Sequence, residues 1–264
     1  MDQIASGVWT HSVDADGFPT ICSVVFSGTR AFIVDTLTGP DAMRPVVDFV
    51  EAHLGARRLV TVNTHHHWDH VYGNAAVATG DIVAHRACPR LLRQQLTSAA
   101  ETLPPPPIEG VPLPTVTFGD RLTYRDAGGS VHLIHVPGHS EDSLVVFLAA
   151  AKLLLGGDTV EWPLPNFSQR GGKLAWVRSL RQLKQVPADL IVPSHGPVMS
   201  KTIIDVNERY IVGVYEAVEA QKAAGVPRHE VDVSAAPLLP EGVRLDTVYA
   251  EAHRGNVLWA WDDV

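Results

Sequence analysis

The amino-acid sequence predicts an α+β protein in which sheets are layered against helices. β-Branched runs such as RLVTVN (58–63) alternate with stretches of helical periodicity such as 41–54. One set of strands and helices is then followed by a second set, a succession typical of layered folds. The 264 residues are 45% hydrophobic, so the chain can bury a large core in one large domain or two small ones.

The first half of the chain is expected to open with two strands and a helix. Residues 20–37 contain two β-rich runs around the turn Ser27-Gly28-Thr29, and the periodic segment 41–54 ends at Gly55, a helix-stop residue. The elements expected next are a strand at 58–63, a short helix at 70–78, a strand at 81–84 and a helix at 86–100.

The second half is expected to begin with a loop. Residues 103–114 contain six prolines in twelve positions, and proline lacks the N–H that regular elements require. The elements expected after this loop are strands at 115–124, 130–136 and 143–155, a helix at 173–185, a strand at 189–192, a helix at 201–224 ending at Gly225, and a short helix at 253–264.

Charge and composition exclude several classes of protein. Lys and Arg total 21 and Asp and Glu total 29, giving a net charge of −8. Nucleic acid and anionic membranes are bound through Lys and Arg, so neither is expected as a partner. The N-terminus does not resemble a signal peptide, and the apolar stretch 144–155 is too short to span a membrane. We therefore expect a cytoplasmic protein, with Cys22 and Cys88 as buried thiols.

Several of the 13 histidines fall in one segment, THHHWDH (64–70). The segment follows a β-branched strand and precedes a helix, so its side chains project from a strand-end loop. On extended backbone a spacing of two places His65 and His67 on the same side, and Asp69 and His70 follow at the start of the helix. Three imidazoles and a carboxylate in so short a segment are typical of a divalent-metal site.

Further ligands are expected from three other strand ends. His139 in PGHS, Asp158 in GGDT and His195 in PSHG each follow an apolar strand and stand beside glycine. Glycine allows the backbone to turn sharply and to approach a crowded site. Because the arrangement recurs three times after the histidine cluster, it favours a shared metal centre over isolated structural residues. Ser140, beside His139, is expected to be a structural hydroxyl and not a nucleophile.

Together these motifs resemble the signature of the metallo-β-lactamase-fold superfamily, over about residues 20–200. THHHWDH resembles its HxHxDH motif, and PGHS, GGDT and PSHGP resemble its later His, Asp and His motifs. Asp35, in AFIVDT, corresponds to an early aspartate that ends a strand and supports the ligands. The resemblance implies a four-layer αββα sandwich with the metal site at one edge of the sheets, and a single domain over 1–264.

The resemblance also implies a ligand set and a cofactor. His65, His67 and His139 would bind a first metal ion, and Asp69, His70 and His195 a second, with Asp158 bridging both. Two Zn²⁺ ions are the expected cofactor, with iron or manganese as alternatives. Such a pair of ions lowers the pKa of a shared water toward about 7 and yields a hydroxide nucleophile. Asp69 is the expected catalytic carboxylate, which holds the nucleophile and passes a proton to the leaving group.

Asp158 narrows the expected reaction. Zinc β-lactamases of the superfamily commonly carry Cys or Ser at the corresponding position, so the aspartate favours lactonase, thioesterase, esterase or phosphodiester-type members. Among these, a hydrolase of a small ester, lactone or thioester is expected. The alternatives are a mono-iron persulfide dioxygenase-like oxidoreductase and a β-lactam or phosphodiester hydrolase of the same fold. A non-catalytic metal-binding protein is disfavoured because all seven ligands are present.

Substrate contacts are expected from loops. The proline-rich segment 103–114 is one candidate, and Glu161–Gly172, which closely follows Asp158, is another. Tyr72 replaces a glycine common in the family, and it is expected either to form a wall of the site or to pack between helix and sheet. The candidate substrate-binding residues are Tyr72, Trp162, Asn166, Phe167 and Arg170.

Five basic residues and no acidic one occur between residues 170 and 185. This run predicts a solvated helix face above a buried apolar stripe formed by Leu174, Val177, Leu180 and Leu183. The alternative is a positive patch that steers a carboxylate-bearing substrate toward the site.

Overall fold

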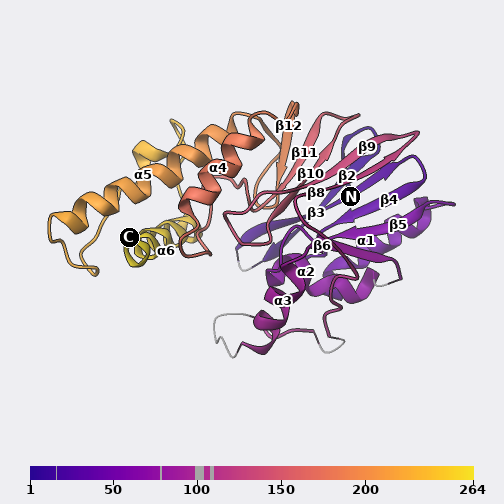
Figure 1. The fold of residues 1–264 in the computed structure, drawn as a ribbon, viewed down its shortest axis with the longest axis horizontal. Coiled ribbons are helices and arrows are strands. Elements are labelled where there is room, and N and C mark those ends of the chain that lie inside the picture. The colour runs from indigo at the N-terminus through magenta and orange to yellow at the C-terminus, as the bar shows by residue number, and fades with distance from the viewer. Residues whose placement is uncertain (16, 78, 99–103, 108–109) are drawn as a thin grey trace.

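Two β-sheets pack face to face, and helices cover the outer face of each, as Figure 1 shows. The structure is a computed structural model and describes residues 1–15, 17–77, 79–98, 104–107 and 110–264. The predicted α+β class and the αββα layering are confirmed.

The first sheet has seven strands in the order β1-β2-β3-β4-β5-β6-β7. Its strands are β1 (Asp2–Ala5), β2 (Val8–Ala15), β3 (Phe18–Ser27), β4 (Arg30–Val34), β5 (Arg58–Val62), β6 (Asp81–His85) and β7 (Val116–Phe118). Neighbours run antiparallel from β1 to β4 and parallel from β4 to β7. The carboxyl ends of β4, β5 and β6 therefore meet at one edge, where the loops of parallel sheets commonly form a site.

The second sheet has six strands in the order β13-β12-β11-β10-β9-β8. Its strands are β8 (Arg121–Asp126), β9 (Gly129–His135), β10 (Leu144–Leu148), β11 (Leu153–Gly157), β12 (Leu190–Pro193) and β13 (Met199–Ser200). All neighbours are antiparallel except β11 and β12, which are parallel. The ends of β11 and β12 consequently point to the same edge.

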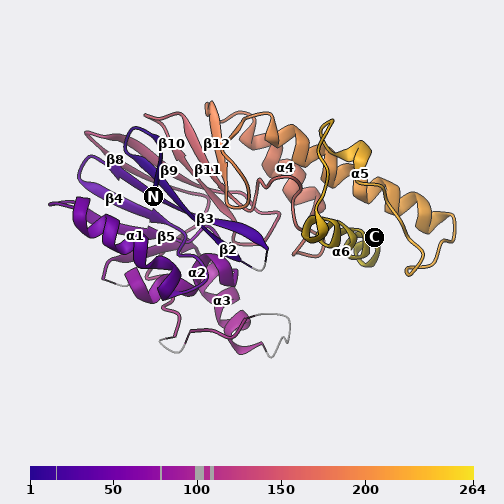
Figure 2. The ribbon, with the colours of Figure 1, turned by 180° about the vertical axis from the view of Figure 1, so that it is seen from behind.

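The helices form two separate groups. Beside the first sheet lie α1 (Pro40–His53), α2 (Trp68–Val71), the 3₁₀ helix η1 (Tyr72–Val77) and α3 (Cys88–Thr97). Beside the second sheet lie α4 (Lys173–Leu183), α5 (Ile203–Ala223), the 3₁₀ helix η2 (Ala236–Leu238) and α6 (Thr247–Asp263). Seen from behind in Figure 2, α5 and α6 extend beyond the end of the sheets. No helix in the described part of the chain is long and apolar enough to cross a membrane.

Alternating side chains on the central strands fill two apolar layers at once. On β11, Leu153 and Leu155 lie in the core between the sheets, whereas Leu154 lies in the core between the second sheet and α4, α5 and α6. Successive residues of a strand point to opposite faces. A strand covered on both faces therefore reads as an unbroken apolar run, which explains the LLL sequence here.

Several sequence predictions of local structure were wrong. Residues 143–155 form two strands, β10 and β11, and not one, because the chain turns at 149–152, where Lys152 adopts φ 47°. Strands β1 and β2 were missed because their side chains alternate only weakly between buried and exposed. The last helix begins at Thr247 and is longer than expected. Leu174 is 68% exposed, and Trp176 takes its place in the buried stripe of α4.

Candidate metal centre

Five chain segments meet at one edge of the sandwich and carry the seven candidate ligands. The loop after β5 carries His65 and His67, α2 carries Asp69 and His70, and the connection from β9 to β10 carries His139. Asp158 follows β11 directly, and His195 follows β12. Both sheets thus contribute to the site through the ends of their strands.

The first group of ligand atoms belongs to His65, His67, His139 and Asp158, and all its atoms lie within 4.8 Å of one another. His67 Nδ1 lies 2.9 Å from His65 Nε2 and 3.0 Å from His139 Nε2. Asp158 Oδ2 lies 3.5 Å from His65 Nε2 and 3.4 Å from His139 Nε2. Three imidazole nitrogens and one carboxylate oxygen therefore face a common centre.

The second group consists of Asp69, His70 and His195. Asp69 Oδ2 lies 3.3 Å from His70 Nε2 and 3.6 Å from His195 Nε2. Asp158 also contacts this group, because its Oδ1 lies 3.3 Å from His70 Nε2 and its Oδ2 lies 3.3 Å from His195 Nε2. Asp158 therefore stands between the two groups, in the position from which one carboxylate can serve both.

The donor set fits a divalent metal ion. Imidazole and carboxylate groups are the ligands that zinc and iron favour in proteins. His70 Nε2 and Asp158 Oδ1 are buried and have no hydrogen-bond partner within the described residues. A buried polar atom without a partner is unfavourable, and a metal ion at the centre would satisfy both atoms.

The two groups carry different charge. Burial lowers the pKa of three imidazoles and keeps them neutral, namely those of His65, His67 and His139. The neutral form is the one that binds metal. Burial also opposes the charged form of His195, but the carboxylates of Asp158 and Asp69 outweigh it and raise the pKa of His195 to about 10. A site that holds positive charge between carboxylates suits a cation in the same place.

Each of four imidazoles is held from behind by a hydrogen bond to its Nδ1. The partners are Asp35 Oδ2 for His70 at 2.9 Å, the Asn166 carbonyl for His139 at 3.0 Å, the Pro19 carbonyl for His195 at 2.9 Å and Thr64 Oγ1 for His65 at 3.1 Å. These bonds leave Nε2 of all four rings facing the centre. Outer partners of this kind fix the ring orientation of metal-binding histidines.

Asp35 is the most extensively bonded of these outer partners. It follows β4 with φ 63° and is 1% exposed. Its Oδ1 accepts a hydrogen bond from the Thr64 amide at 2.7 Å, and its Oδ2 accepts one from Thr64 Oγ1 at 2.8 Å. Asp35 therefore fixes His70 and the start of the histidine loop together.

Substitution Asp35→Asn is expected to weaken metal binding by about 10- to 100-fold. Asparagine keeps the size of the side chain but directs an NH₂ group at hydrogen-bond donors, so His70 loses its fixed orientation. Competition with a chromogenic chelator measures the change. Asp41→Asn is the control, because the Asp41 side chain is 94% exposed on α1; equal affinities of the two variants would contradict the role of Asp35.

His66 points away from the centre and joins two loops of the site. Its Nδ1 donates to Asp142 Oδ1 at 2.9 Å, and the same buried carboxylate accepts a hydrogen bond from Ser140 Oγ at 2.8 Å. Gln95 Nε2 donates to the His66 carbonyl at 3.1 Å. The histidine loop is thereby connected to the loop of His139, and the Ser140 hydroxyl has the structural role expected from the sequence.

A cavity of about 610 Å³ opens over the two groups. Five of the candidate ligands line it: His67, Asp69, His139, Asp158 and His195. Its walls come from β2 and β3, the loop and helix at 66–69, one face of α3, and the segment 161–168. The cavity has the size of a small-molecule site.

The structure brings only one of the five predicted substrate contacts to this cavity. Asn166 lines it, whereas Tyr72, Trp162, Phe167 and Arg170 are absent from its described wall. Phe167 is 8% exposed and lies in the core beside Trp176. Trp162 packs against the same core.

Tyr72 and Arg170 have other partners. Tyr72 is 2% exposed, packs against Val71 and Leu92, and donates from its hydroxyl to the Pro104 carbonyl at 3.3 Å. This is the packing alternative considered for it. Arg170 lies over the Trp259 ring at 4.8 Å and pairs with Asp262.

Three of the other four basic residues of this run pair with α5. Lys173 pairs with Glu219 at 3.0 Å, Arg181 with Glu208 at 2.7 Å, and Lys184 with Glu208 at 2.6 Å. These contacts favour the solvated helix face over the anion-steering patch.

Sequence reasoning missed three parts of the wall. Glu161 is 4% exposed, lines the cavity and lies 3.5 Å from His139 Nδ1; it belongs to the candidate segment Glu161–Gly172 but was not among the side chains singled out there. Phe18 lies on a strand whose start was not predicted. The wall formed by α3 and the residue that follows it consists of Leu91, Gln94, Gln95 and Ser98. Their spacing places them on one helix face, and that signal was available in the sequence.

The segment that carries Asn166 is held by α6. Asn256, 1% exposed, accepts a hydrogen bond from the Phe167 amide at 2.8 Å and donates to the Pro165 carbonyl at 2.8 Å. The residue between these two contacts is Asn166, whose carbonyl orients His139. The C-terminal helix therefore fixes one wall of the cavity.

Substitution Asn256→Leu is expected to destabilise the protein by about 2 kcal/mol, because it leaves a buried amide and a buried carbonyl without partners. We also expect KM to rise for any substrate that contacts the 165–168 segment. Thermal unfolding and steady-state kinetics measure both effects. Glu251→Leu, at an exposed position of α6, should change neither the stability nor KM. A similar rise in KM in that variant would contradict the proposed role of Asn256.

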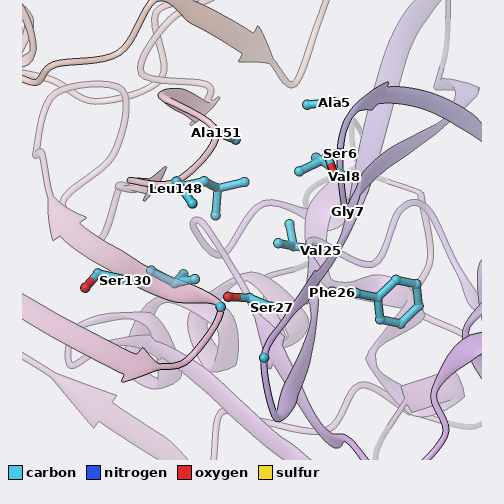
Figure 3. Close-up of a pocket in the computed structure, with 14 residues that line it drawn as sticks. Ala5, Ser6, Gly7, Val8, Val25, Phe26, Ser27, Ser130, Leu148 and Ala151 are labelled. Carbon is cyan, nitrogen blue, oxygen red and sulfur yellow. The ribbon is translucent and has the colours of Figure 1, made fainter.

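A second cavity, of about 500 Å³, lies between the sheets at the opposite ends of the strands (Figure 3). Ser6, Val25, Ser27, Leu148 and Ala151 are among the residues around it. No titratable side chain occurs in its described lining. The described lining of this cavity therefore offers no group for acid–base or metal chemistry.

Comparison with known families gives a match to the model described as "Metallo-beta-lactamase superfamily", over residues 15–195. The matched range contains all seven candidate ligands and ends at His195. It leaves α5 and α6 outside.

Two curated relatives illustrate the range of matches. A linear primary-alkylsulfatase from Pseudomonas sp. is 38% identical over 93 residues, which cover 33% of this chain and 18% of the relative. A hydroxyacylglutathione hydrolase from Rhodospirillum rubrum is 30% identical over 204 residues, which cover 71% of this chain and 69% of the relative. The chain spans less than two thirds of the first curated relatives it matches, from 18% to 58% of their length.

Solved structures show the same fold. A metallo-beta-lactamase from Pontibacter korlensis superposes with a TM-score of 0.63 at 24% identity, covering 77% of this chain and 94% of that protein. The family model, the fold and the two ligand groups agree with one another. This chain belongs to the metallo-beta-lactamase superfamily.

Proposed function

We propose that this protein is a metal-dependent hydrolase of a small ester, lactone or thioester. The observation that carries the proposal is the position of Asp158 between two groups of ligand atoms at the floor of a small-molecule cavity. The hydroxyacylglutathione hydrolase and alkylsulfatase relatives are hydrolytic enzymes by name, which supports the reaction class.

We assign the ligands as the sequence predicts. His65, His67 and His139 would hold one ion, Asp69, His70 and His195 the other, and Asp158 both. We propose two Zn²⁺ ions, with iron or manganese as alternatives. Bound there, such ions supply Lewis acidity toward the substrate and lower the pKa of water.

The protein's own groups position the reactants. Asp69 lines the cavity, and its Oδ2 accepts a hydrogen bond from Thr20 Oγ1 at 3.2 Å, which fixes the carboxylate. From there it is placed to orient a water molecule by accepting its proton and to return that proton to the leaving group. The Nδ1 contacts behind the imidazoles keep the ligand atoms preorganised. The buried floor excludes bulk water from the reacting bond.

We further propose that residues 1–264 act as a single domain. Val257 and Ala260 of α6 lie in one apolar core with Leu154 of β11 and Leu180 of α4. A core that runs from the second sheet through α6 favours one folding unit. A small molecule is the proposed partner, and nucleic acid is not.

A test of the function combines metal analysis with hydrolysis assays. We expect zinc and turnover of an ester, lactone or thioester from a panel that also contains a phosphodiester and a β-lactam. Iron content together with oxygen consumption on a persulfide would instead establish the oxidoreductase alternative. A protein that contains metal but turns over no substrate in the panel would contradict the proposal.

Metal removal is expected to destabilise the protein as well as to inactivate it. Without cations the carboxylates of Asp69 and Asp158 remain buried among imidazoles, and burial of charge without full compensation is unfavourable. A ligand that binds the folded state at 1,000 times its Kd contributes about 4 kcal/mol to stability. Dialysis against a chelator should therefore lower the Tm by roughly 10 °C, and added Zn²⁺ should restore it. An unchanged Tm would show that the site does not bind metal.

A further inference from the structure

The wall of the cavity carries information about the substrate that the ligands do not. Outside the ligand set, four of its side chains are apolar: Ala15, Phe18, Trp68 and Leu91. Five are polar and uncharged: Gln94, Gln95, Ser98, Asn166 and Ser168. The remaining two are His66, whose ring is bonded to Asp142, and Glu161.

No Lys or Arg lines the described part of the cavity. The structure does not describe residues 16, 78, 99–103 and 108–109. Their sequences are D, A, AAETL and IE, which contain no Lys or Arg. Arg90 and Arg93 lie on α3 outside this lining. Arg90 donates to Gln94 Oε1 at 3.1 Å and pairs with Glu141, and Arg93 donates to the Pro89 carbonyl at 3.4 Å. Arg170, beyond the 161–168 segment, pairs with Asp262.

This distribution of charge discriminates between substrates. A carboxylate, sulfate or phosphate remote from the reacting bond would lose water on entering the cavity and would find no positive side chain in exchange. The further carboxyl group of the wall, on Glu161, offers such an anion no attraction. An apolar chain, in contrast, gains contact with Phe18, Trp68 and Leu91.

We propose that the natural substrate is an uncharged ester or lactone with an apolar chain, and that a second, anionic group on the substrate is selected against. The proposal rests on the hydrolase function proposed above and narrows it. The apolar side chains hold the hydrocarbon part of the substrate. The amide and hydroxyl groups on the exposed face of α3 donate to its uncharged polar atoms.

A matched series of chromogenic esters tests the proposal. The metal-loaded protein is assayed with p-nitrophenyl hexanoate, with the p-nitrophenyl monoester of adipic acid, and with p-nitrophenyl acetate, each corrected for spontaneous hydrolysis. The first two esters have acyl chains of the same length, and they differ in a terminal methyl against a terminal carboxylate. We expect kcat/KM for the hexanoate to exceed that for the adipate by at least about tenfold, and to exceed that for the acetate as well.

A charge placed in the wall provides the second measurement. Gln94 lies on the exposed side of α3 and lines the cavity, so Gln94→Lys introduces the missing cation. Gln94→Met is the matched control, with similar length and no charge. We expect Gln94→Lys, relative to Gln94→Met, to shift the ratio of adipate to hexanoate kcat/KM about tenfold toward the adipate.

The outcomes separate this proposal from the function on which it rests. If protein that contains metal hydrolysed none of these esters and none of the lactones and thioesters of the earlier panel, the hydrolase function itself would be overturned. Hydrolysis of the adipate as fast as the hexanoate would leave the hydrolase function standing and overturn the proposed selection for uncharged substrates. An unchanged ratio of adipate to hexanoate kcat/KM in Gln94→Lys would show that the cavity wall does not cause that selection.

Discussion

Substitution Asp158→Asn is expected to lower kcat/KM by at least about 10³-fold. A loss of that size corresponds to about 4 kcal/mol of transition-state stabilisation, which is the scale of a metal ion's contribution. Asp158 contacts His65 and His139 in the first group and His70 and His195 in the second. An amide has the same shape but carries no charge and only one acceptor atom, so under the proposed assignment it would not neutralise and bridge two cations.

Metal content and secondary structure together distinguish the loss of a shared metal ligand from a general loss of folding. We expect Asp158→Asn to bind less metal per chain than the unaltered protein while retaining its secondary structure. Asp189→Asn is the matched control, because the Asp189 side chain is 71% exposed and pairs with Lys152 on the surface. If Asp158→Asn kept both its metal and its turnover, the shared-ligand assignment would be wrong.

Substitution Gly73→Ala is expected to destabilise the protein by about 3 kcal/mol or more. A Cβ atom on Gly73 would lie 1.9 Å from the Thr36 carbonyl oxygen and 2.6 Å from Met43 Cγ. Both neighbours belong to the packed interior between η1 and α1, so the backbone has to move. The Tm should fall by on the order of 10 °C. Activity should fall with it, because Thr36 bonds to the carbonyl of His70.

Gly255→Ala is the control for the glycine series. Gly255 lies inside α6 and has no atom within 4 Å of an added Cβ. Alanine has the higher helix propensity, by about 1 kcal/mol, so this variant should be slightly more stable. Equal destabilisation of the two variants would show that steric clash is not the cause at Gly73.

The ligands of the site could be predicted from the sequence because they lie at the ends of strands. His139, Asp158 and His195 each follow an apolar run, and the edge to which parallel strands point is a property of topology. Those residues can therefore be placed together from the sequence alone. The structure adds that Gly73 stands where a side chain cannot fit, while Tyr72 finds space beside Leu92.

The substrate wall could not be predicted in the same way. Whether Phe167 faces the cavity or the core depends on Trp176, Tyr210 and Tyr215, which come from helices distant in the sequence. Arg170 has an ordinary loop sequence around it, and its partner Asp262 lies on α6. Side-chain direction in loops is decided by such long-range packing, which local patterns do not encode.

The anchoring of the cavity wall by Asn256 has a consequence for how the protein matures. All seven candidate ligands precede residue 196, whereas α6, which fixes the Asn166 segment, is synthesised about fifty residues after the last of them. A nascent chain can therefore complete its metal-binding residues well before its substrate wall is in place. A fragment that stops before Thr247 would contain every candidate ligand and still lack the helix that holds the Asn166 segment, so the substrate wall depends on residues synthesised after the ligands.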